Sequence, residues 1–192
     1  MAELLKHRYN PTLISSLAKT LQLAYQTFDV DGFIASVFDA DWDEKELKDR
    51  MKHVAVSMHQ HLPNSYAQSI EILKKAAPKF SGFEYMFFPA YVELYGLDQF
   101  EASVSALEFF TEFSSSEFAV RPFIKQYPDR MMTKMRTWAS SNNLHVRRLA
   151  SEGCRPRLPW AMALPDFKEN PESRSCSFLG RTSSHESKES RA

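Results

Sequence analysis

The sequence is poor in glycine and cysteine and contains no long apolar run. Its 192 residues include five glycines and two cysteines. Two cysteines cannot build the multi-bridge framework on which small secreted domains depend, and no apolar run approaches the length of a transmembrane helix. We therefore expect a cytoplasmic protein with no membrane partner.

The sequence also lacks the common signatures of nucleotide binding, serine hydrolysis and zinc hydrolysis. It has no glycine-rich phosphate loop and no Gly-x-Ser-x-Gly motif. His53, His59 and His61 lie in one expected helix, but they lack the four-residue spacing and the glutamate of a His-Glu-x-x-His site. We expect neither a metal nor an organic cofactor.

The formal net charge of zero conceals an uneven distribution. Residues 1–120 hold ten Lys and Arg against seventeen Asp and Glu, whereas residues 121–157 hold nine against two. Such a basic segment indicates an anion-binding face. The alternative is a solvated helical face that happens to be rich in arginine.

Apolar residues recur with helical spacing from end to end, and no segment alternates as a strand would. The expected helices are residues 12–26, 30–38, 43–61, 65–76, 85–95, 98–112, 116–126, 128–139 and 143–152. The N-caps that we expect within this pattern are Asp43, Asn64 and either Ser115 or Ser116. Short loops between successive helices predict antiparallel helix pairs stacked side by side.

A weak internal sequence similarity indicates which type of helical repeat is present. Val120 and Arg121 align with Val146 and Arg147 when the two helices are superposed by sequence. Val-Arg at such a place is typical of HEAT-like repeats, although two amphipathic helices can also match by chance. The fold class expected is all-α, a HEAT-like solenoid of antiparallel helix pairs in a right-handed curved superhelix.

The basic segment ends in one dense run, His145-Val-Arg-Arg-Leu-Ala-Ser-Glu-Gly-Cys-Arg-Pro-Arg-Leu-Pro-Trp160. Val146, Leu149 and Ala150 have the spacing of a buried helical face, which leaves the arginines of this run exposed. Guanidinium groups gathered in this way favour phosphate as a partner. The exposed arginines expected are Arg147, Arg148, Arg155 and Arg157.

Two carboxylates and one aromatic residue stand within or beside this positive segment. Glu117 and Glu152 can each form an ion pair with a nearby arginine, and Arg121 lies one helical turn from Glu117. A carboxylate in a cationic groove can also stabilise a positively charged reacting group and position a water. Trp160 follows two prolines and can either cover the end of the core or contact a base or sugar.

These residues resemble a known family, the AlkC branch of the bacterial AlkC/AlkD DNA glycosylases. The resemblance rests on three stretches and covers about residues 10–171; Ser-Glu-Gly-x-Arg-Pro-Arg-Leu-Pro-Trp is its most specific motif. The stretches are Ser115-Ser-Glu-Phe-Ala-Val-Arg-Pro-Phe123, Trp138-Ala and the run from His145 to Ala161.

The resemblance implies a cradle for duplex DNA and hydrolysis of the N-glycosidic bond of alkylated bases. The bases implied are 3-methyladenine and 3-methylcytosine, whose positive charge in the DNA already activates them as leaving groups; no metal or cofactor is implied. Glu117 and Glu152 correspond to glutamates at the lesion site and are the expected catalytic residues. The expected lesion and DNA contacts are Trp160, Arg121, Arg147, Arg148, Arg155 and Arg157. We expect a monomer that associates with the nucleoid when bound to DNA.

The sequence departs from the family pattern after about residue 171. The family continues with a repeat that carries its principal catalytic aspartate, whereas residues 171–192 are serine-rich and lack helical period. We expect a helical-repeat domain over residues 1–170 that is truncated or frameshifted, with impaired activity, and a disordered tail over residues 171–192. The alternative is a non-catalytic helical-repeat module that binds DNA or an acidic protein.

Overall fold

The computed structural model describes residues 5–169, and every regular element in that range is a helix. All nine predicted helices are present, so the all-α prediction is confirmed. They are α1 (Pro11–Ala24), α2 (Val30–Val37), α3 (Leu47–His61), α4 (Tyr66–Ala76), α5 (Phe87–Tyr95), α6 (Phe100–Phe110), α7 (Val120–Gln126), α8 (Pro128–Ala139) and α9 (Leu144–Gly153).

Five shorter helical turns were not predicted, because segments of three or four residues are too short to show helical period. They are the 3-10 turns η1 (Leu5–Arg8), η2 (Trp42–Glu44), η3 (Ala77–Lys79) and η4 (Phe83–Met86), and the short helix α10 (Asp166–Glu169). None of the helices in residues 5–169 combines the length and the apolar character that crossing a membrane requires.

The chain forms two compact units, residues 1–115 and 116–192. In a helical-repeat protein each repeat contacts only its neighbours, so two compact units can form within one repeat domain. A single domain over residues 1–170 therefore stays a prediction. The disordered tail predicted for residues 171–192 lies outside the described residues.

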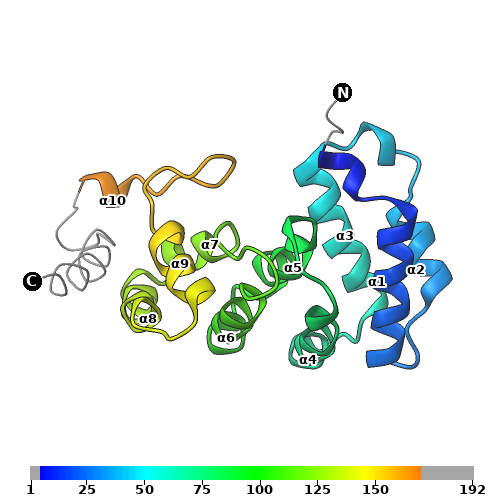
Figure 1. The fold of residues 1–192 in the computed structure, drawn as a ribbon, viewed down its shortest axis with the longest axis horizontal. Helices are drawn as coiled ribbons and strands as arrows, with labels where there is room; N and C mark the ends of the chain where they lie inside the picture. The colour runs from blue at the N-terminus through cyan, green and yellow to red at the C-terminus, as the bar shows by residue number, and fades with distance from the viewer. Residues whose placement is uncertain (1–4, 170–192) are drawn as a thin grey trace, which may run out of the picture. The chain divides into compact units, whose positions relative to one another are not determined.

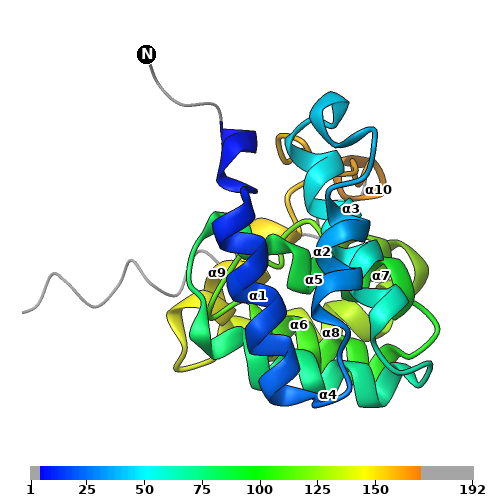
Figure 2. The ribbon, with the colours of Figure 1, turned by 90° about the vertical axis from the view of Figure 1, so that its right-hand side faces the viewer.

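In the first unit, six helices pack as neighbouring pairs. The helix α1 contacts α2 and α4, α3 contacts α2 and α5, and α6 contacts α4 and α5 (Figure 1). Figure 2 shows α1 and α2 from a second direction. Aromatic residues of α5 belong to this core: Phe87, Phe88 and Tyr91 are buried, and the Phe88 ring stacks on Phe110 of α6.

The second unit is built on α7, α8 and α9, with α8 contacting both of the others (Figure 1). Its core includes Phe123 from α7 and Met135 and Trp138 from α8, all buried. The α9 residues that helical spacing assigned to the core are buried as predicted; they are Val146, Leu149 and Ala150. The face of α9 that carries the arginines is therefore directed away from α8.

The predicted helix starts differ from the observed ones at three places. Asp43 lies within η2, where the neighbouring Trp42 ring is buried against Phe38, so α3 begins four residues later with Glu46 as its N-cap. Ser65, rather than Asn64, is the N-cap of α4. Residues 117–119 form a turn, and α7 begins at Val120 with Ala119 at the cap position. At the start of α3, packing of the buried Trp42 ring outweighs the capping signal of Asp43.

Candidate functional site

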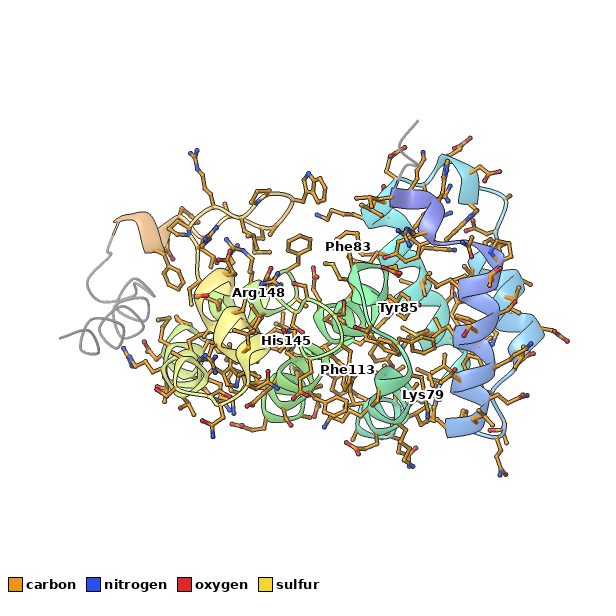
Figure 3. All side chains as sticks on the ribbon, viewed as in Figure 1. Lys79, Phe83, Tyr85, Phe113, His145 and Arg148 are labelled. Atoms are coloured by element: carbon orange, nitrogen blue, oxygen red, sulfur yellow. The ribbon has the colours of Figure 1, made fainter. Side chains whose placement is uncertain are left out.

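Glu117 lies in the turn that precedes α7, and its side chain is almost buried, with 10% of its surface exposed. The Nη2 atom of Arg148 on α9 lies 2.8 Å from its Oε1 atom, and Figure 3 shows Arg148 on that helix. Sequence spacing allowed Arg121 as a local partner of Glu117, but the ion pair with Arg148 joins two separate segments of the second unit. Folding therefore places a nearly buried carboxylate beside an exposed guanidinium group.

Glu152 lies in the last turn of α9 and is also ion-paired. Its Oε1 atom lies 2.8 Å from Nη2 of Arg155, three residues further along the chain. The Glu152 side chain is 24% exposed and that of Arg155 is 58% exposed. Both candidate carboxylates thus lie in the second unit, and each has an arginine partner that remains more than half exposed.

Arg121 does not lie on the exposed basic face, where a direct contact with DNA would place it. The residue is fully buried, because its guanidinium group donates hydrogen bonds to backbone carbonyls of the segment that follows α9. The acceptors are the carbonyl oxygens of Gly153, Pro156 and Met162. Burial lowers the pKa of the Arg121 guanidinium. This side chain supports a loop in place of presenting a charge to solvent.

The four arginines of the basic run are exposed, as predicted. Arg147 donates to the carbonyl oxygens of Ser141 and Asn142, at 2.8 and 3.0 Å, and stays exposed while doing so. Four exposed guanidinium groups on α9 and the segment after it suit a polyanion. The contact of these arginines with DNA remains a prediction. They are Arg147, Arg148, Arg155 and Arg157.

Trp160 lies at the tip of a tight turn and is 61% exposed. The amide of Ala161 donates to the carbonyl of Leu158 at 3.1 Å, and Trp160 has a φ of 65°, the single positive value at a non-glycine among the described residues. Proline at the second position and positive φ at the third define a type II turn, which normally has glycine where Trp160 stands. An indole ring is thus held outward by a strained backbone.

The turn that carries Trp160 was not predicted from the sequence. The Leu-Pro-Trp-Ala sequence carried a signal for the turn, since proline favours the second position of a type II turn. No sequence signal assigned Arg121 to the carbonyls of this segment. Within residues 5–169, no three His, Cys, Asp or Glu side chains are placed to hold a metal ion.

The arrangement can stabilise positive charge and exchange a proton. Glu117 and Glu152 offer two carboxylates in one unit, exposed arginines can hold an anionic ligand, and the Trp160 ring offers an apolar surface. A site of this composition suits a reaction in which an anionic substrate develops positive charge.

Comparisons with known proteins bear on the fold and the sequence of the chain. No family model matches the chain. An uncharacterized protein of Bacillus subtilis (strain 168), YhaZ, is 45% identical over 167 residues, which are 87% of this chain and 47% of that protein. Among solved structures, the Pseudomonas fluorescens alkylpurine DNA glycosylase AlkC, bound to DNA containing an abasic site analog, matches with 39% identity and a TM-score of 0.85. The match covers 90% of this chain and 48% of that one.

Within the described residues, the fold is that of a helical-repeat protein, and it is similar to the structure of a DNA glycosylase. The resemblance that the sequence indicated is confirmed: the chain is similar to AlkC in sequence and in fold. It spans about half the length of the two proteins that it matches.

Proposed function

We propose that this chain acts in DNA alkylation repair, hydrolysing the N-glycosidic bond of cationic alkylated bases in duplex DNA. The bases proposed are 3-methyladenine and 3-methylcytosine. The observation that carries the proposal is the structural likeness to an alkylpurine DNA glycosylase bound to DNA. That likeness coincides with a unit in which two carboxylates lie beside exposed arginines.

DNA is the proposed ligand of the exposed arginines. A guanidinium group matches the geometry of a phosphate and stays charged at any physiological pH. Arg157 is exposed, and Arg148 and Arg155 each keep more than half of the side chain exposed while paired. The ion pair between Arg155 and Glu152 is the more exposed of the two pairs, so a phosphate can replace it at lower cost.

The chemistry proposed needs little activation of the leaving base. When the bond between C1′ and the base nitrogen breaks, its electron pair neutralises the positive charge of the alkylated base. The sugar then carries the positive charge as an oxocarbenium-like species, which a nearby carboxylate stabilises. A water adds to C1′ and gives up a proton, leaving an abasic site and a free base.

Glu117 and Glu152 divide these tasks in the proposal. Glu117 is the less exposed of the two, and a carboxylate shielded from water stabilises a nearby cation more strongly. We assign Glu117 to the sugar cation. Glu152, at the more open end of α9, is assigned to the attacking water as its proton acceptor. Trp160 is assigned to the lesion, against which its exposed ring packs.

The test is an assay of alkylated duplex DNA for freed methylated bases, with binding measured on the same duplex. Glu117→Gln and Glu152→Gln keep side-chain size and hydrogen bonding but remove the negative charge. We expect the pair of changes to lower base release by about 100-fold or more. Asp129→Asn, an exposed acid at the start of α8, is the matched control and should release bases like the parent chain.

The same experiment separates catalysis from binding alone. If the parent chain binds the duplex in a salt-dependent way but releases no base, the module alternative replaces the enzyme. If the double variant releases bases at the parent rate, the two glutamates have no catalytic role. Sedimentation of the free chain tests the further proposal that it is a monomer.

A further inference from the structure

Trp160 is carried by an irregular loop, residues 155–164, which we call the Trp160 loop. The loop is closed at its base by a hydrogen bond from the amide of Leu164 to the carbonyl of Pro156, at 3.0 Å. It is closed at its tip by the turn bond from Ala161 to Leu158. Between these two bonds the loop lacks helix and strand, so the direction of the Trp160 ring depends on support from outside the loop.

Arg121 supplies that support to both arms of the loop. Its Nη2 atom donates to the Pro156 carbonyl at 3.3 Å, on the arm that leaves α9. Its Nε atom donates to the Met162 carbonyl, on the arm that returns. Its Nη1 atom donates to the Gly153 carbonyl at 2.9 Å, which ties the loop to the end of α9. One side chain on α7 thus fixes both arms relative to the helix from which the loop departs.

The planar, forked guanidinium group of arginine allows one residue to hold both arms of the loop. Its nitrogens lie in one plane and donate in several fixed directions, whereas a lysine ammonium is a single point on a flexible stem. The Arg121 side chain is fully buried, so its hydrogen bonds do not exchange readily with water. Burial also lowers the pKa of its guanidinium, which shows that the surroundings penalise the charge and that the carbonyl contacts must offset this penalty.

The backbone conformation of Trp160 requires support from its surroundings. A positive φ at a residue with a side chain is unfavourable and persists only where the surrounding structure enforces it. The two arms that Arg121 holds set the ends of the turn in which Trp160 has its φ of 65°. Loss of the fork would let the turn relax and the ring leave its outward direction.

We propose that Arg121 is the positioning residue of the lesion site: it holds both arms of the Trp160 loop and thereby aims the Trp160 ring at an alkylated nucleotide. This proposal rests on the proposed function, because an alkylated nucleotide is the ligand. The role of Arg121 in ordering the Trp160 loop can be tested without DNA.

The first experiment measures the order of the loop in the free chain. Trypsin can cut after Arg157, within the loop, whereas Arg155 is followed by proline and resists cleavage. In Arg121→Met, which keeps the apolar stem and removes the fork, cleavage after Arg157 should accelerate about tenfold or more. Arg121→Lys should lie between Met and the parent. Arg136→Met, an exposed position on α8, is the control and should cut at the parent rate.

The second experiment links the loop to the lesion. The ratio of affinities for a duplex with an abasic site analog and for an undamaged duplex measures lesion preference. Arg121→Met and Trp160→Ala should each lower this ratio by about tenfold. The double variant should lose no more than either single one, because both changes remove the same interaction.

The outcomes are distinct. If the parent chain shows no lesion preference, the proposed function fails, and the tryptic result still decides the role of Arg121 in the loop. If Arg121→Met keeps both slow cleavage and lesion preference, the positioning role is overturned. Additive losses in the double variant also overturn it, because Arg121 would then act independently of Trp160. If Arg121→Met does not fold, as judged by circular dichroism, the same comparisons are made with Arg121→Lys.

Discussion

The guanidinium of Arg148 on α9 and the carboxylate of Glu117 before α7 form an ion pair of 2.8 Å across 31 positions of sequence. The pair is asymmetric, because the Arg148 side chain is 59% exposed and the Glu117 side chain 10% exposed. The loss of Arg148 and the loss of Glu117 should therefore lower the free energy of unfolding by different amounts.

Arg148→Met should destabilise the chain more than Glu117→Gln does. Without its arginine, Glu117 keeps a nearly buried negative charge that has lost a charge-assisted hydrogen bond, and we expect a loss of about 1 kcal/mol in the free energy of unfolding. Arg148 without its glutamate is simply hydrated, so Glu117→Gln should cost less. Urea unfolding of both single variants and the double variant checks the order; equal losses would contradict the asymmetry.

Charge removal on the basic run should reduce the salt dependence of DNA binding. Each arginine that contacts a phosphate contributes about 0.9 to the slope of log affinity against log salt concentration. We expect Arg155→Gln and Arg157→Gln each to lower the slope by about that amount. Fluorescence anisotropy of a labelled duplex over a salt series measures it. Lys125→Gln, exposed on α7, is the control, and an equal fall there would show that net charge alone matters.

Gly153→Ala should destabilise the second unit through one specific clash. A β-carbon at this position would lie 2.9 Å from Cγ1 of Val120 and 3.6 Å from the terminal methyl of Met135. Crowding of this kind in a packed core costs about 1–3 kcal/mol. The Val120 side chain is short and branched, so it cannot swing away. Val120→Ala should therefore relieve much of the loss in the double variant, as measured by urea unfolding; strictly additive losses would count against this contact.

Acid should weaken the first unit through His59. Its ring stacks on Tyr95 with centroids 3.7 Å apart, its Nδ1 atom lies 3.1 Å from the Tyr91 hydroxyl, and burial lowers its pKa. Folding thus favours neutral His59, and the unfolded chain binds more protons between the folded-state pKa and the ordinary value of about 6.5. This contribution to stability is complete above pH of about 6.5 and is lost as the pH falls through the folded-state pKa.

The measurement is the free energy of unfolding between pH 7.5 and 5. We expect its fall toward acid to be smaller in His59→Gln than in the parent chain. His145→Gln, exposed on α9, is the control and should leave the fall unchanged. A His59 variant with the full acid dependence would show that other groups carry it.

Much of the fold was predictable because helical period is a local property. The spacing of Val146, Leu149 and Ala150 predicted the buried face of α9, and all three are buried. The exposure of Arg147 and Arg148 followed from the same period. The start of α3 was predicted wrongly, since burial of Trp42 within η2 outweighs the capping preference of Asp43. The catalytic and DNA-contacting roles of the site residues remain predictions.

The sequence by itself determined the helices, the basic run and the AlkC-like motif, because these features depend on the identity and spacing of residues that are close together in the chain. Only the tertiary structure decided which charged side chains are buried and which partners they have. It buried Arg121 under the Trp160 loop, paired Glu117 with Arg148 in place of its neighbour, and gave Trp160 a positive φ. The sequence does not show whether an arginine is exposed to solvent or donates to three backbone carbonyls. For Arg121, the packing of α7 against the segment after α9 decides this.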